Sequence, residues 1–286
     1  MHRRRFLAAG TAIGSSLLLG GRAAAAADGR PILIGTTPVF LDDEVAFLRE
    51  WQGYLAQRLG RPVAFVHRGT YREISELVLG EKIDAAWVCG FPYMRYHARM
   101  RLLAVPTWLG KPLYRSYVIV PADDRVTKSI LDLRGKIYAF SDPDSNSGWL
   151  VPQAELERGG NDRASFFRKS FFTYAHRRVV DAVAAGVAHG GSVDGYVWDT
   201  LQVLHPELTR QTRVASRSPE FGFPPFVARA NLAESDFRRL QEVLLGMQSE
   251  PAGLALLRKL NLDGFQPGSD QLFAGIAANM HLLGIG

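Results

Sequence analysis

The sequence predicts an α/β protein with two similar lobes joined by crossover strands. Short runs of β-branched and aromatic residues alternate with stretches of helical periodicity, a pattern typical of α/β folds. The alternation starts again after about residue 116, which indicates two units in succession. Once a predicted leader of 27 residues is removed from the 286, about 259 remain, enough for one large or two modest domains with their own cores.

The first 27 residues have the features of a twin-arginine export signal. Residues 3–7 follow the order Arg-Arg-x-Phe-Leu, and residues 11–21 form a short apolar stretch. That stretch is shorter than the roughly 20 residues that span a bilayer, and the alanines at 23–27 offer cleavage sites. The alternative is an uncleaved amphipathic N-terminus. We expect a periplasmic protein that is not membrane-anchored.

Removal of the leader changes the charge of the chain. Thirty-four basic residues minus the four in the leader leave 30 against 28 acids, a net charge of +2. No run of Lys and Arg interleaved with aromatics is present, so nucleic-acid binding is not predicted. The single cysteine, Cys89, excludes an intramolecular disulfide.

The first unit is predicted from residue 31 onward. Acids at 42–44 suit a helix start, apolar residues then recur at helical spacing up to Leu59, and Gly60 ends the pattern. A second helix is predicted over 71–79. The strands that we expect in this unit are 31–35, 61–66 and 83–88.

The second unit begins with an aromatic, β-branched strand over 113–121. Further strands are predicted at 136–140, 171–174, 192–198 and 212–216, with helices near 129–133, 149–158 and 179–187. The last helices are predicted over 234–247 and 251–260.

The most informative segment is the polar loop 141–148, between a predicted strand and a predicted helix. Its sequence, SDPDSNSG, includes Ser145, Asn146 and Ser147. Free N–H groups at a helix start, together with hydroxyl donors, form an anion site suited to a tetrahedral oxyanion. The alternative is an ordinary capping loop with Ser145 or Ser147 as the N-cap.

Two further segments could contribute to such a site. His176 lies where a strand gives way to a helix, so it could donate to an anion or be a structural histidine. Cys89 and Tyr93 follow the strand at 83–88, and ligands of open α/β sheets sit at strand carboxyl ends. Cys89 could equally be a small buried apolar residue. No enzyme motif is present, so we expect no enzyme, cofactor or metal site.

Four segments resemble the phosphonate-binding, PhnD-like branch of type II periplasmic solute-binding proteins of ABC transporters. They are residues 68–71 (RGTY), 83–88 (IDAAWV) with Tyr93, 142–148 (DPDSNSG) and 176–186. The resemblance covers nearly the whole mature chain. It implies two α/β lobes with two crossover hinge strands, one comprising 28–115 plus 219–286 and the other 116–218.

The resemblance also implies a ligand site and a partner. Tyr71 and Tyr93 would come from one lobe, and Ser145, Asn146, Ser147 and His176 from the other. Hinge closure would bring them together in the form that a membrane transporter recognises.

The sequence departs from the family pattern at several of these positions. Asn146 stands where threonine is usual, Ala175 where serine precedes the histidine, and Cys89-Gly90 where Gly-Pro is usual. Residues 222–226 (GFPPF) are apolar where binders of aminoalkylphosphonates place a carboxylate. Phosphate, phosphite or a short alkylphosphonate therefore fits better than an amine-bearing ligand.

Two functions from different classes follow. The first is an uptake receptor that delivers a small oxyanion to an ABC transporter permease. The second is a periplasmic sensor that binds arsenite or another soft ligand through Cys89 and signals to a membrane histidine kinase, because thiolates favour soft ligands.

Overall fold

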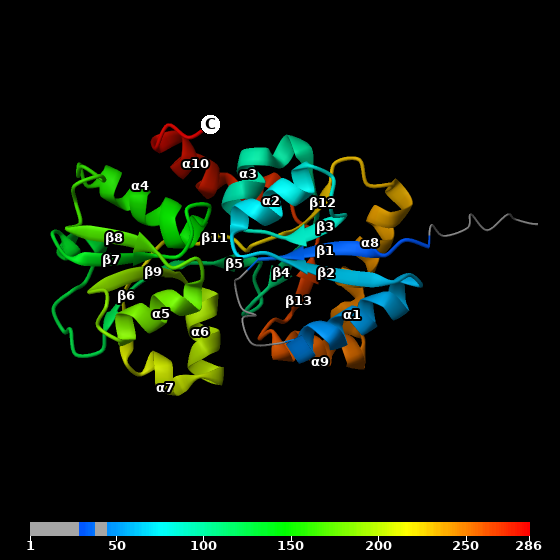
Figure 1. Cartoon of the computed structure of the whole chain (residues 1–286), viewed down its shortest axis with the longest axis horizontal. Helices are drawn as coiled ribbons and strands as arrows, with labels where there is room; N and C mark the ends of the chain where they lie inside the picture. Colours follow the sequence, from blue (N-terminus) through cyan, green and yellow to red (C-terminus); the bar gives the residue numbers. More distant parts are fainter. Residues whose placement is uncertain (1–28, 38–44) are drawn as a thin grey trace, which may run out of the picture.

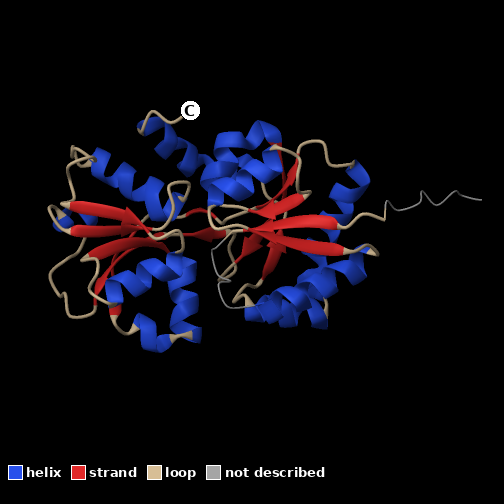
Figure 2. Cartoon of the chain, in the orientation of Figure 1, coloured by secondary structure: helices blue, strands red, loops and turns tan. Residues whose placement is uncertain are grey.

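A computed structural model describes residues 29–37 and 45–286 of the chain. The predicted export signal and the predicted helix start at 42–44 lie outside these residues. Figures 1 and 2 show two lobes, each a sheet flanked by helices, joined through a narrow middle region. The α/β two-lobed fold that the sequence predicts is confirmed.

The first lobe is built on a six-stranded mixed sheet in the order β13-β4-β12-β3-β1-β2. β1, β2 and β3 are parallel, whereas β12 and β13 return antiparallel from the end of the chain. The strands are β1 (Ile32–Thr36), β2 (Val63–His67), β3 (Ala85–Trp87), β4 (Met100–Thr107), β12 (Phe226–Arg229) and β13 (Gly264–Gln266). The helices are α1 (Val45–Leu59), α2 (Tyr71–Leu79), α3 (Gly90–Tyr96), α8 (Glu234–Gly246) and α9 (Pro251–Lys259).

The second lobe has a five-stranded mixed sheet in the order β10-β6-β9-β7-β8. β7, β8 and β9 are parallel, and β6 is antiparallel to β9. The strands are β6 (Ser116–Pro121), β7 (Ile137–Phe140), β8 (Lys169–Phe172), β9 (Gly190–Asp194) and β10 (Thr212–Arg217). The helices are α4 (Val151–Arg158), α5 (His176–Ala184), α6 (Gly195–Leu204) and α7 (Pro206–Thr209).

Two short strands connect the lobes. β5 (Leu113–Tyr114) and β11 (Phe221–Gly222) pair antiparallel, with Tyr114 opposite Phe221, and both lie between the lobes in Figure 1. The predicted strand over 113–121 is therefore two strands, because its first residues pair with β11 and its later ones with β9 and β10. The predicted lobe limits at 115/116 and 218/219 stay a prediction.

The predicted strand over 192–198 is wrong in its second half, where α6 begins at Gly195. The carboxylate of Asp194 accepts a hydrogen bond from the backbone N–H of Tyr196 at 2.9 Å and so starts the helix. Helix α10 (Ala274–Leu282), which the sequence analysis did not predict, packs against α3 of the first lobe and α4 of the second.

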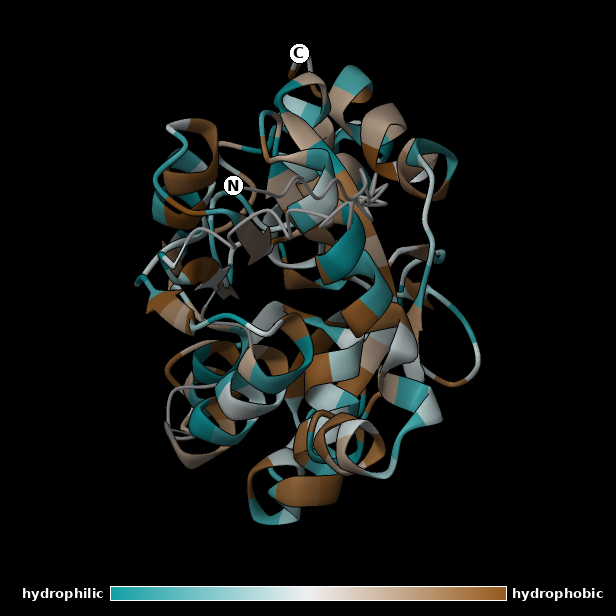
Figure 3. Cartoon of the chain, turned by 90° about the vertical axis from the view of Figure 1, so that its right-hand side faces the viewer, coloured by the Kyte–Doolittle hydropathy of each residue, from teal (hydrophilic) through white to brown (hydrophobic). Residues whose placement is uncertain are grey.

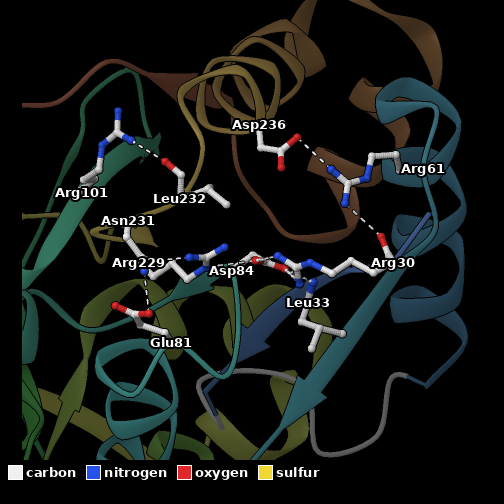
Figure 4. A network of polar contacts seen from close by, with 10 residues as sticks. All are labelled: Arg30, Leu33, Arg61, Glu81, Asp84, Arg101, Arg229, Asn231, Leu232 and Asp236. Atoms are coloured by element: carbon white, nitrogen blue, oxygen red, sulfur yellow. Dashed lines mark hydrogen bonds and ion pairs between the residues drawn. The ribbon is translucent and has the colours of Figure 1, made fainter. Parts of the chain in front are cut away.

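A buried carboxylate ties the first lobe together. Asp84 precedes β3 and accepts hydrogen bonds from Arg30 Nη2 at 2.8 Å, Leu33 N at 3.0 Å and Arg229 Nε at 3.1 Å (Figure 4). Burial would raise the pKa of Asp84, but these hydrogen bonds hold it below its usual value. Asp84 thus fixes the start of β1 to the start of β3 and the end of β12.

The helices carry hydrophilic and hydrophobic residues along their length (Figure 3), as expected where one face covers a sheet. Trp51, Ile74 and Phe226 lie in the core of the first lobe, and Tyr138, Phe166 and Val120 in that of the second. Within the described part of the chain, no helix is both long and apolar enough to span a membrane.

Candidate functional site

The candidate site lies at one edge of the second lobe's sheet, facing the first lobe. β7, β8 and β9 run parallel, so their carboxyl ends share that edge. The loop after β7 contains residues 141–145, the segment after β8 leads to His176, and β9 ends at Asp194. Ligands of open α/β sheets bind at such an edge.

The loop after β7 is folded tightly around Gly148. Ser145 is the N-cap of a π-helical turn (Asn146–Leu150), and its hydroxyl accepts a hydrogen bond from Gly148 N at 2.9 Å. A Cβ at Gly148 would lie 1.8 Å from Ser141 Oγ. Only glycine therefore lets the loop fold this tightly. The four polar residues at 141 and 145–147 are all buried.

Three polar atoms of this loop are buried without a hydrogen-bond partner among the described residues. They are Ser141 Oγ, Asn146 Oδ1 and Ser147 Oγ. An unpaired buried polar group costs about 1–3 kcal/mol, so native proteins seldom keep several together. Their grouping indicates a site for a polar ligand.

His176 is the first residue of α5 and is buried. Its Nδ1 lies 3.0 Å from the backbone nitrogen of Asp194. Because a backbone N–H can only donate, Nδ1 accepts, and the neutral ring carries its proton on Nε2. Burial lowers the pKa of His176 to about 3. The ring is therefore a neutral donor at physiological pH.

The first lobe brings Tyr71 and Cys89 to the same place. The rings of Tyr71 and His176 are 6.5 Å apart, centroid to centroid. Cys89 Sγ accepts a hydrogen bond from Asn146 N at 3.2 Å. Burial raises the pKa of the Cys89 thiol to about 12 and the pKa of Tyr71 well above its usual value, so both groups are uncharged.

Other contacts also cross between the lobes. Tyr71 N donates to Asp142 Oδ2 at 3.2 Å, and Arg72 Nε donates to Asp144 Oδ2 at 3.1 Å. The first turn of α2 is thus held by the two carboxylates of the Asp-Pro-Asp segment. The structure is a closed form, with the candidate site covered by both lobes.

Tyr93 is placed differently from the other predicted residues. Its hydroxyl donates to Asp270 Oδ1 at 2.5 Å, and its ring packs on Phe273 with centroids 5.0 Å apart. The structure brings Tyr71, Cys89, Ser145, Asn146, Ser147 and His176 together, but it directs the Tyr93 hydroxyl to the C-terminal segment. A ligand-binding role for any of the seven stays a prediction.

The sequence analysis missed Tyr114 of β5. This tyrosine is fully buried, and its hydroxyl accepts a hydrogen bond from Asn146 Nδ2 at 2.9 Å. Its ring lies 5.8 Å from that of Phe223. The sequence did offer a signal, because Tyr114 lies in the aromatic strand predicted over 113–121. A crossover strand passes behind the cleft, so its side chains can reach the site. Ser141 and Asp194 were missed as well.

Carboxyl groups are among the ionisable groups buried at the site. Asp142 and Asp194 are buried, and burial raises the pKa of both. Among the described residues no Lys or Arg is buried, and Arg72, on Asp144, has a side chain that is 62% exposed. An anion here would be held by neutral N–H and O–H donors rather than by a cation.

Comparisons with known proteins agree with this architecture. Residues 34–273 match the family described as "ABC transporter, phosphonate, periplasmic substrate-binding protein". The phosphonates-binding periplasmic protein of Escherichia coli is 26% identical over 231 residues, 77% of this chain and 68% of that protein. The phosphate-import protein PhnD of Mycolicibacterium smegmatis is 28% identical over 158 residues, 51% of this chain and 48% of that protein.

Among solved structures, PhnD1 of Prochlorococcus marinus in complex with methylphosphonate superposes with a TM-score of 0.81 and 17% identity, covering 90% of this chain and 99% of that one. At this identity the likeness shows a shared fold. The family match extends over most of the described residues and includes both lobes. The chain therefore belongs to the periplasmic phosphonate-binding components of ABC transporters, which bind substrates and are not enzymes.

Proposed function

We propose that this protein captures a small phosphorus oxyanion, namely phosphate, phosphite or a short alkylphosphonate, and delivers it to the permease of an ABC transporter. The observation that carries the proposal is the group of three buried, unpartnered polar atoms of Ser141, Asn146 and Ser147. Hydroxyl and amide groups can each meet a different oxygen of a tetrahedral anion, and a helix start adds partial positive charge.

The polar loop is followed by an apolar group, because Tyr114 contacts Asn146 on one side and Phe223 on the other. Phe223 is fully buried and packs on Tyr114 and Tyr196, with ring centroids 5.8 and 4.9 Å away. Phe223 belongs to the apolar segment 222–226, where the resemblance places a carboxylate in binders of aminoalkylphosphonates. This apolar segment suits a hydrogen or a methyl group on phosphorus, since neither needs a hydrogen-bond partner.

Calorimetric titration of the mature protein with phosphite, methylphosphonate and phosphate tests the proposal. We expect at least one of the three to bind, and His176→Ala to weaken that binding about 10- to 100-fold, because a buried hydrogen bond to a charged ligand is lost. Ser192→Ala is the matched control, because the Ser192 hydroxyl pairs with Tyr138 OH in the second-lobe core. Equal affinities for wild type and His176→Ala would rule out an oxyanion site that includes His176.

Export by the twin-arginine pathway is part of the proposal. Replacement of Arg3 and Arg4 by lysine in the full chain is expected to stop secretion, since that pathway reads the arginine pair. Fractionation of cells that express both versions measures this. Equal amounts in the periplasm would point to another export route.

A second candidate function follows from the position of Cys89. Its Sγ contacts Asn146 N inside the site, so a soft ligand such as arsenite, bound there through sulfur, would occupy the same space. In that case the partner would be a membrane histidine kinase. Titration with arsenite, repeated on Cys89→Ala, separates the two functions: only the sensor requires the thiol.

A further inference from the structure

Asp194 is a buried carboxyl group at the site for which the proposed function gives no role. It ends β9, and its backbone N–H donates to His176 Nδ1 at 3.0 Å. Its strand partner is Ser116, whose hydroxyl donates to the carbonyl oxygen of Ser147 at 2.6 Å. The backbone of Asp194 is thus tied to both halves of the candidate anion site in the second lobe, and its Oδ1 accepts from Tyr196 N at 2.9 Å.

Among the described residues, no buried Lys or Arg pairs with Asp194. Burial raises its pKa to about 8, although backbone N–H groups of Tyr196 and Val197 oppose the shift. His176 is neutral, and the charge of Asp194 also acts on Tyr71, Cys89 and Tyr114 across the cleft. The titratable groups that face it are His176 on α5, Asp199 on α6, Tyr71 on α2, Cys89 before α3 and Tyr114 on β5.

This arrangement is unfavourable for two negative charges at once. A dianion beside an ionised carboxylate repels it, and no buried Lys or Arg among the described residues offsets the repulsion. One proton between an oxygen of Asp194 and an oxygen of the ligand removes this repulsion. The protonated group then donates a short O–H···O hydrogen bond to the one that stays charged.

We propose that Asp194 and the bound oxyanion share one proton, so that the site takes a phosphorus oxyanion only together with one titratable hydrogen. The inference rests on the proposed function and adds a ligand class to it: oxyanions that still bear one P–O–H group, or that receive the proton from Asp194. When both partners are ionised, binding must take up a proton from the solvent.

The test is calorimetry with methylphosphonate between about pH 6 and pH 9.5, in two buffers of different ionisation enthalpy. For the wild type we expect uptake of one proton per ligand above about pH 8.5, where both partners are ionised. The affinity should fall about tenfold per pH unit in that range.

Asp194→Asn should abolish this fall of affinity with pH, because an amide donates a hydrogen bond to the ligand but does not titrate. Asparagine also caps helices well, so α6 should still start at Gly195, and Asp194→Ser is a second capping variant if the first does not fold. Asp199→Asn is the matched control. Asp199 accepts from Tyr117 OH at 2.8 Å, and its charge raises the pKa of Asp194, so this variant should keep the slope and only move its onset to lower pH.

Three results would overturn the shared proton. They are a flat wild-type affinity above about pH 8.5, an unchanged slope in Asp194→Asn, or a wild-type preference for 2-aminoethylphosphonate that Asp194→Asn loses. The last would make Asp194 the partner of an ammonium group. Failure of the proposed function has a different outcome: none of methylphosphonate, phosphite and phosphate binds at any pH.

Discussion

Cys89 Sγ, from the first lobe, accepts the backbone N–H of Asn146, from the second, at 3.2 Å. This N–H belongs to the first turn after Ser145, where unpaired N–H groups would otherwise face an anion. Sulfur is a weak acceptor, so the contact satisfies the donor only in part. The thiol therefore stabilises the closed form and leaves the donor available to a stronger acceptor.

The first prediction concerns the reactivity of this thiol. Burial raises the pKa of Cys89 to about 12, so very little thiolate is present at pH 8, and thiolate is the reactive form. Alkylation by iodoacetamide should be about a thousandfold slower in the native protein than in urea. Because Cys89 is the only cysteine, mass spectrometry follows it directly, with Cys89→Ser as the blank. A native rate close to the unfolded one would mean that the closed form is rarely populated.

The second prediction separates ligand binding from stability. The Ser147 hydroxyl is buried and unpaired, so Ser147→Ala should leave the free energy of unfolding of the ligand-free protein unchanged or raise it by up to about 1 kcal/mol. The same substitution should weaken oxyanion binding about 10- to 100-fold.

Ser192→Ala should do the opposite. Its hydroxyl is paired with Tyr138 OH, so its loss should cost about 1–3 kcal/mol of stability and leave affinity unchanged. Urea unfolding and calorimetry on both variants measure the two effects. If Ser147→Ala and Ser192→Ala lose stability alike, the Ser147 hydroxyl stabilises the fold and is not reserved for a ligand.

Much of this architecture could be predicted because local pattern and fold agree. The helix over 71–79 was placed correctly, since Thr70 and Glu73 form a capping box and the apolar face is periodic. The strand prediction failed at residues 195–198 because a β-branched and aromatic composition suits a strand as well as a buried helix. The cap on Tyr196 N decides for the helix, and periodicity alone does not reveal it.

The site was predicted only in part, for a physical reason. Ser145, Asn146, Ser147 and His176 lie next to strand ends, which a sequence shows. The hydrogen-bond partners of a hydroxyl group come from other segments of the chain, and the sequence does not show which segments these are. Tyr93 follows β3 as expected, yet Asp270, 177 residues later, accepts its hydroxyl. Tyr114 reaches Asn146 only because the crossover strand passes behind the loop.

The third prediction concerns the contact between α2 and the Asp-Pro-Asp segment. Arg72→Ala removes the ion pair with Asp144 and should weaken ligand binding about two- to fivefold, because an exposed pair contributes little. The loss should shrink at high salt, which screens exposed charges. Arg68→Ala is the control, since the Arg68 side chain is exposed and donates to its neighbour's carbonyl, His67 O. Equal losses in both variants at every salt concentration would show that the Arg72–Asp144 ion pair does not hold the two lobes together.

The fourth prediction is a pH dependence of stability that comes from His176. Its pKa is about 3 in the folded chain because of burial, against an ordinary value near 6.5 in the unfolded chain. The unfolded state therefore binds the proton first. The stability that His176 contributes is complete above about pH 6.5 and is lost as the pH falls toward 3, by at most about 1.4 kcal/mol per pH unit.

His176→Asn isolates this effect, because the asparagine oxygen can still accept the Asp194 N–H and does not titrate. Urea unfolding from about pH 8 down to about pH 4.5 should give a slope shallower by one proton for this variant than for the wild type. His205→Asn, at the protein surface beside Glu207, is the matched control and should keep the wild-type slope. Identical curves for wild type and His176→Asn would mean that the buried ring is protonated in the folded state. Its Nδ1 could not then accept from Asp194, and the neutral donor on which the anion site depends would be lost.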